Sequence, residues 1–182
     1  MPNLYKLMAQ ALLPGALVAL LIGIAASKGV ATEERDARAV EATIQSFEQA
    51  VQDFDLDKAN SLLAPGARWI EYSPPAKLDE FEWPRINRLK VAGVRIAFRL
   101  RDFRADVEGD VAWTTLTLEG VFSSNTPEGK KLLQPVPGRC SYRADTVNCK
   151  ATFVESEVLI RTASGWRIAL GHTSELPRPQ GT

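Results

Sequence analysis

The sequence has few of the residues on which metal and thiol chemistry depends. Its 182 residues include one histidine and two cysteines, too few for a structural zinc site with its usual four ligands. It has no GxSxG nucleophile elbow, no Walker phosphate loop and no dinucleotide-binding glycine fingerprint. We therefore expect no metal ion and no cofactor.

The chain also lacks an excess of positive charge. It has 22 basic and 22 acidic residues. Without residues 1–31, which contain Lys6 and Lys28 and no acid, 20 basic residues remain against 22 acidic ones. A nucleic-acid binder needs a strongly basic surface, so we predict that nucleic acid is not a partner.

An uncharged apolar run at residues 7–26 follows Lys6. A basic residue, an apolar stretch and then small residues form the pattern of a secretory signal peptide. The small residues at 25–27 and 29–31 offer cleavage sites. We therefore predict that residues 1–31 are an export signal and that the folded domain is periplasmic or secreted.

The same run allows an alternative, an uncleaved membrane anchor, because about 20 apolar residues can span a bilayer. Residues 7–26 would then be the only membrane contact, and Lys6 would favour a domain outside the cytoplasm. Hydrophobic residues make up 45% of the chain, which suits one domain of about 150 residues. We expect this domain at residues 32–176, followed by a flexible tail at 177–182.

Cys140 and Cys149 both lie in the region predicted to be exported, within the polar segment GRCSYRADTVNCK. An oxidising compartment would allow them to form a disulfide. The alternative is a pair of free buried thiols, which the polar surroundings disfavour. A bridge that closes so short a loop would stabilise the fold by roughly 2 to 3 kcal/mol.

The segment after Thr32 has the pattern of an amphipathic helix, with acidic residues in its first turn. Apolar residues then recur at steps of three and four, which predicts one buried stripe. These residues are Val40, Ile44, Phe47, Val51 and Phe54. Asp55 can cap a second short helix, which the Pro65-Gly66 pair would end.

Strand patterns dominate the rest of the chain. We expect strands at residues 67–72, 94–101, 111–122, 152–162 and 166–173. Short helical pieces interrupted by Pro84 are expected at 77–92, and a polar excursion at 123–150. The order predicts an α+β domain, in which helices pack on the concave face of a cone-shaped, curved antiparallel sheet and leave a pocket.

The strand at 94–101 has arginines on its polar face, at positions 95, 99 and 101. A binding patch is one interpretation, but a solvated ladder of opposite charges is the more usual one. We expect the acidic partners to be Glu119, Glu155 and Glu157.

Three stretches resemble the nuclear transport factor 2-like superfamily, which includes ketosteroid isomerases and SnoaL-like domains. IQSFEQAVQDFDLDKANSLLAPGARWIEY is similar to the opening of a steroid isomerase, VEGDVAWTTLTLEG to the superfamily's turn and long strand, and GWRIALGHTS to its terminal strand. The resemblance covers residues 33–175. It implies the cone-shaped fold more strongly than any activity.

The resemblance to isomerases places their proton-shuttling carboxylate at Glu71. Trp69 shares its strand face, and an acid held against tryptophan loses hydration, which favours general acid/base chemistry. The isomerase tyrosine falls at Phe47, which has no hydroxyl. The second oxyanion donor falls near Glu157, which strand alternation turns to the opposite face. Both departures argue against a steroid isomerase.

Two readings remain open for each candidate catalytic residue. Glu71 is either the active acid/base group or a strand-end carboxylate paired with an arginine or a backbone donor. His172 shares strand parity with Trp166, Ile168 and Leu170. It therefore either faces the pocket mouth as a partner of Glu71 or packs at the end of the sheet.

Aromatic residues without a complete catalytic set favour a binding module. We expect Phe47, Trp69, Trp83 and Trp113 to contact a small apolar molecule. The superfamily resemblance also implies pairing through the open sheet face into a homodimer. The alternative is a SnoaL-like enzyme that uses Glu71, with or without His172, for isomerisation, dehydration or cyclisation.

Overall fold

The computed structural model describes residues 13–73, 76–78, 83–133 and 139–176. These described residues divide into two units, one up to Asp36 and one from Ala37 onward. The start of the predicted signal and the predicted tail lie outside the described residues, so both stay predictions. In the part of the chain that the structure describes, no helix is long and apolar enough to cross a membrane.

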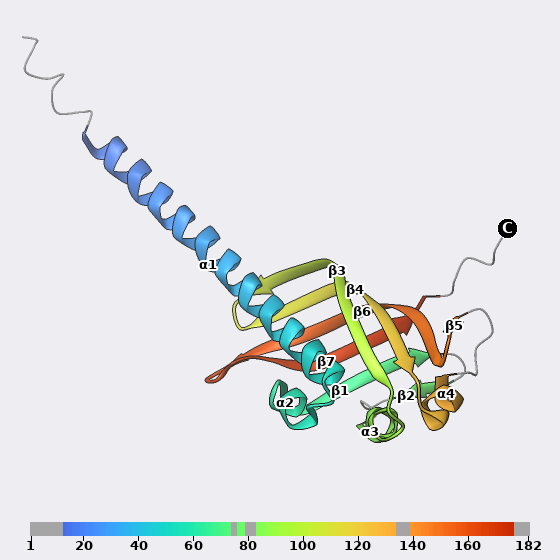
Figure 1. Cartoon of the computed structure of the whole chain (residues 1–182). Helices are drawn as coiled ribbons and strands as arrows, with labels where there is room; N and C mark the ends of the chain where they lie inside the picture. Colours follow the sequence, from blue (N-terminus) through green and yellow to red (C-terminus); the bar gives the residue numbers. More distant parts are fainter. Residues whose placement is uncertain (1–12, 74–75, 79–82, 134–138, 177–182) are drawn as a thin grey trace, which may run out of the picture. The chain divides into compact units, whose positions relative to one another are not determined.

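The predicted helices and long strands occur in the expected order, and the described residues add two short strands and one short helix (Figure 1). The elements are α1 (Leu13–Gln52), α2 (Leu56–Ser61), β1 (Leu63–Ser73), β2 (Ala76–Leu78), α3 (Trp83–Val91), β3 (Arg95–Glu108), β4 (Val111–Ser124), α4 (Pro127–Leu133), β5 (Cys140–Arg143), β6 (Thr146–Thr162) and β7 (Gly165–Glu175).

The strands form one curved, open sheet in the order β2-β1-β7-β6-β4-β3, with β5 paired to β6. Figure 1 shows the C-terminal part of α1 lying across one face of it. The predicted α+β class is confirmed, but the sheet is mixed rather than wholly antiparallel, because β1 runs parallel to β7. This pairing joins the first long strand to the last one, and no local sequence pattern indicates it.

The core lies between the C-terminal part of α1 and the sheet. The predicted helical stripe is buried from Val40 to Val51, whereas Phe54 is only half-buried and has a φ of 56° after the helix ends. Inward residues of the strands complete the core, including Trp69, Leu116, Leu159 and Ile168. Asp55 caps α2 as predicted, since its carboxylate accepts a hydrogen bond from the Lys58 amide at 3.0 Å.

Prolines interrupt the helices and strands less than the sequence predicts. Pro84 lies in the first turn of α3, where a proline costs no intrahelical hydrogen bond. Pro65 and Gly66 lie within β1 instead of ending α2, at an irregularity where the register with β7 shifts. Gly66 has a φ of 73°, which suits a residue without a Cβ atom.

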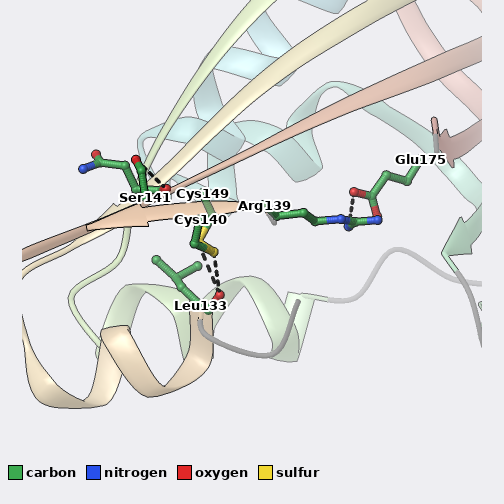
Figure 2. The surroundings of a disulfide bond; sticks show 7 residues. Leu133, Arg139, Cys140, Ser141, Cys149 and Glu175 are labelled. Carbon is green, nitrogen blue, oxygen red and sulfur yellow. Dashed lines mark hydrogen bonds and ion pairs between the residues drawn. A yellow bond between two sulfur atoms is a disulfide. The ribbon is translucent and has the colours of Figure 1, made fainter. Parts of the chain in front are cut away.

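The predicted excursion at 123–150 contains regular structure, namely α4 and the hairpin of β5 and β6. Cys140 and Cys149 are direct partners in this hairpin, with their Cα atoms 4.0 Å apart, and they form the expected disulfide. Both sulfurs lie against the Leu133 carbonyl oxygen, at 3.1 and 3.3 Å (Figure 2). Arg139 forms an ion pair with Glu175 near the end of β7, so the hairpin is also tied to the last strand.

Candidate functional site

A cavity lies beneath α1 and α3, against the inner face of the sheet. It provides about 80 Å³ for the centres of water-sized molecules. Most of its walls are apolar, and its polar groups are carboxylates, one arginine and one threonine. The lining residues are Glu48, Val51, Trp69, Glu71, Arg85, Ile86, Leu89, Ile96, Phe98, Leu118, Phe122, Phe153, Glu155 and Thr173.

Glu71 lines this cavity and is ion-paired with Arg85. The Arg85 guanidinium lies 2.7 Å from Glu71 Oε1, and the two side chains are 43% and 17% exposed. Glu71 and Arg85 are therefore more exposed to solvent than the other acids that line the cavity, Glu48 and Glu155. The structure thus brings Glu71 into the cavity and also gives it the arginine partner of the alternative reading.

Three further carboxyl groups are buried behind Glu71. Glu48 on α1 and Glu155 and Glu157 on β6 are each at most 5% exposed. The prediction that Glu157 faces away from the interior is wrong, as is the expectation that Glu155 and Glu157 face the arginine ladder. On β6 the apolar alternation predicts the wrong face: Val154 is 36% exposed, while Glu155 and Glu157 face inward.

Glu119 is the one member of the predicted ladder that does face an arginine. Arg101 Nε lies 3.4 Å from Glu119 Oε2, and both side chains are largely exposed. A pair this exposed contributes little to stability. The outer face of β3 and β4 therefore supports the solvated ladder.

A chain of hydrogen bonds connects the cavity wall to the buried acids. Trp69 Nε1 donates to Thr173 Oγ1 at 3.0 Å, and Thr173 Oγ1 donates to Glu155 Oε1 at 3.0 Å. Thr114 Oγ1 donates to Glu157 Oε2. Glu155 Oε2 and Glu157 Oε1 are buried. Neither accepts a hydrogen bond from an amide, a hydroxyl or a basic side chain of the described residues.

These acids hold their protons at much higher pH than usual. Burial, and then the charge of Glu157, raises the pKa of Glu155 to about 8. Burial raises the pKa of Glu157 to about 7, against the opposing hydrogen bond from Thr114. Burial also raises the pKa of Glu48 well above its usual value, and the charges of both neighbours add to the effect. Glu48 hydrogen-bonds Glu155, which two carboxyl groups can do only when one is protonated.

Trp69 is positioned by two close contacts. Its ring stacks on Phe47 with centroids 5.2 Å apart. Gly171 lies opposite it on β7, where a Cβ atom would collide with the indole ring. Of the four predicted aromatic contacts, Trp69 lines the cavity, and Phe47 supports it from within the core.

The other two predicted contacts lie elsewhere. Trp83 begins α3 and packs against the core, but it is not among the cavity's lining residues. Trp113 lies on the outer face of β4 and is 44% exposed. The alternation of β4 turns Ala112 and Thr114 inward, so Trp113 must face the other way.

His172 does not line the cavity, so of its two readings the one that makes it a partner of Glu71 has no geometric support. Ile168 is buried, but β7 then carries an extra residue, Ala169, where its register with β6 shifts. The alternation inverts beyond this bulge. Thr173 therefore points inward, while His172 Nε2 lies 3.2 Å from Ser174 Oγ on the outer face.

The buried acids were missed by the sequence analysis, although one signal was present. Glu48 follows Ile44 by four residues and precedes Val51 by three, so it belongs to the buried helical stripe. A carboxylate at such a position needs a structural or functional explanation. Among the described residues, no group of three His, Cys, Asp or Glu side chains could hold a metal ion.

No protein-family model matches the sequence, and no curated protein matches it either. Solved structures do match. A candidate dehydratase of the NTF2-like family from Streptomyces avermitilis is 18% identical with a TM-score of 0.58, over 80% of this chain and 99% of that one. A ketosteroid isomerase-like protein from Erwinia carotovora atroseptica is 14% identical with a TM-score of 0.52, over 79% and 98%.

A third match is the CaMKII hub of S. rosetta, which is 16% identical with a TM-score of 0.52, over 77% of this chain and 96% of that one. Identities this low show a shared fold and nothing about activity. The chain therefore has the nuclear transport factor 2-like fold, as its sequence resemblance predicted.

Proposed function

We propose that this domain binds a compact apolar molecule in the cavity beneath α1 and α3. The observation that carries the proposal is a space with apolar walls contributed by helices and strands alike, beside polar groups in fixed positions. Protein interiors are otherwise close-packed. Pockets of this composition are the usual form of small-molecule sites.

Filling the cavity is expected to abolish binding. Leu89 lines it from α3 and is only half-buried, so Leu89→Trp can occupy the space without disturbing the core. Phenethyl alcohol, a neutral probe, should shift the NMR signals of cavity residues in the wild type but not in Leu89→Trp. Arg88→Trp, an exposed position on the same helix, is the matched control and should bind normally. Equal binding by all three proteins would contradict the proposal.

Acid/base catalysis is the second candidate function. It is supported by Glu155, which lines the cavity and has a pKa raised to about 8, in the range useful for proton transfer. Glu71 lines the same space with Arg85. Isomerisation, dehydration or cyclisation would need one of these acids. If Glu71→Gln and Glu155→Gln both turned over a substrate as fast as the wild type, this candidate would be contradicted.

We further propose that the domain is exported. The disulfide between Cys140 and Cys149 supports an oxidising compartment, the periplasm or the exterior. The apolar run at 7–26 supports a signal peptide that is removed. An intact N-terminus on the exported protein, measured by mass spectrometry, would instead support the anchored form.

The outer sheet face is proposed to pair with a second copy of the chain. Its exposed apolar residues are Val111, Trp113, Val154 and Leu170. Two matched structures are named as a hub and an association domain of CaMKII. Trp113→Glu is expected to convert a dimer into a monomer in light scattering, whereas Val91→Glu, an exposed apolar position on α3, should not. A monomeric wild type would contradict the pairing.

A further inference from the structure

The polar end of the cavity is acidic, whereas the rest of its surface is mainly hydrocarbon. We propose that its ligand is an organic cation, a primary or secondary ammonium attached to a compact apolar group. This inference rests on the proposed function and names the chemical class of the ligand.

Glu155 provides the anchoring group. It lines the cavity and is 4% exposed. Its Oε1 atom accepts the Thr173 hydrogen bond, and its carboxyl group also hydrogen-bonds Glu48, but no basic side chain among the described residues pairs with it. A buried carboxylate without a positively charged partner is costly. An ammonium N–H would supply a charge-assisted hydrogen bond and the opposite charge.

The charges around Glu155 favour a cation as well. Glu48 faces it from α1, Glu157 lies two residues away on β6, and Glu71 contributes from β1. The lining cation among the described residues is Arg85 on α3, and its guanidinium is bound to Glu71 at 2.7 Å. Acidic groups therefore exceed basic ones around the cavity. When these acids are ionised, they repel an anionic ligand and attract a single positive charge.

The walls determine what kind of cation fits. Trp69, Phe98, Phe122 and Phe153 line the same space as Glu155. Their rings offer dispersion contacts to a hydrocarbon group and a favourable surface to an ammonium. A small inorganic cation keeps much of its water and would gain nothing from these walls. The hydrocarbon group is thus as much a part of recognition as the charge.

The affinity of the cavity for an amine should depend on pH. Burial raises the pKa of Glu155 to about 8, so at lower pH the group is mainly protonated in the empty cavity. Binding of an ammonium stabilises the carboxylate and must displace that proton. Affinity for an amine should therefore rise from about pH 5 to about pH 8, and binding near neutral pH should release protons.

The preference for an amine is tested by calorimetric titration of the purified protein with three probes of similar shape. Phenethylamine should bind about 10- to 100-fold more tightly than phenethyl alcohol at about pH 8, and phenylacetate should bind most weakly. The amine's advantage should shrink at about pH 5. Repeating the titration in buffers of different ionisation enthalpy counts the protons released.

Variants separate this inference from the proposed function. Glu155→Gln should lose the preference for the amine while keeping the alcohol's affinity, and Glu119→Gln, on the outer face, should change neither. If the wild type bound amine and alcohol with equal affinity, or if Glu155→Gln kept the full preference for the amine, the proposal of a cationic ligand would be overturned. The proposed binding function of the cavity would still stand. If none of the probes binds, both the inference and the proposed function fail.

Discussion

Glu155→Gln is expected to raise the free energy of unfolding at about pH 8 by roughly 3 kcal/mol, and to leave it nearly unchanged at about pH 4. The amide removes a buried charge while preserving its contacts. Its oxygen can still accept the Thr173 hydrogen bond, and its N–H group can donate to Glu48. Urea unfolding of both proteins across this pH range measures the difference.

The sign follows from the two pKa values of this group. Glu155 loses its proton at about pH 8 in the folded state but near 4.5 in the unfolded chain. Between these values the folded state holds more protons, so stability falls as pH rises. Wild-type protein should therefore be more stable at about pH 5 than at about pH 8. Glu119→Gln, at an exposed ion pair, should change stability by less than about 1 kcal/mol. If Glu155→Gln were instead less stable than the wild type at about pH 8, the buried charge of Glu155 would not be the destabilising feature described here.

Phe47→Ala is expected to lower the free energy of unfolding by about 3 to 5 kcal/mol, because a large buried ring is lost and the space it leaves cannot fully close. Phe47 is 1% exposed and stacks on Trp69, which in turn donates to Thr173. The melting temperature should fall by about 2 to 4 °C for each kcal/mol lost.

A matched truncation provides the control for this second effect. Phe54 lies just beyond the same helix and is only half-buried, so Phe54→Ala should cost less than Phe47→Ala. The tryptophan emission of Phe47→Ala should also change, since the Trp69 ring loses its stacking partner. Equal melting temperatures for the two variants would contradict the central position of Phe47 in the core.

The architecture could be predicted because its signals are local. Helical stripes, the Asp55 cap and the alternation of the long strands are readable from neighbouring residues, and the resemblance of three stretches to a known superfamily agreed with them. The parallel pairing of β1 with β7 could not be predicted in this way. It depends on contacts such as that of Glu71 with Thr173, which are far apart in the sequence.

The candidate site was only partly predictable, because strand alternation gives a direction only until a bulge. Ala169 inverts the alternation of β7, so Thr173 rather than His172 reaches the interior. On β6 the rule that apolar residues face inward gave the wrong face, since this cavity buries Glu155 and Glu157. The apolar pattern predicts exposed positions for these acids, and a specialised interior is where such a prediction is expected to fail.

The position of β7 between β1 and β6 has a consequence for how the protein is made. A ribosome delivers the strands in chain order, so an interior strand of this sheet is the last to emerge. Until then β1 and β6 each leave a long edge unpaired, and the nascent polypeptide cannot complete its sheet. Closure of the sheet therefore has to wait for β7, whatever the order in which the other strands pair.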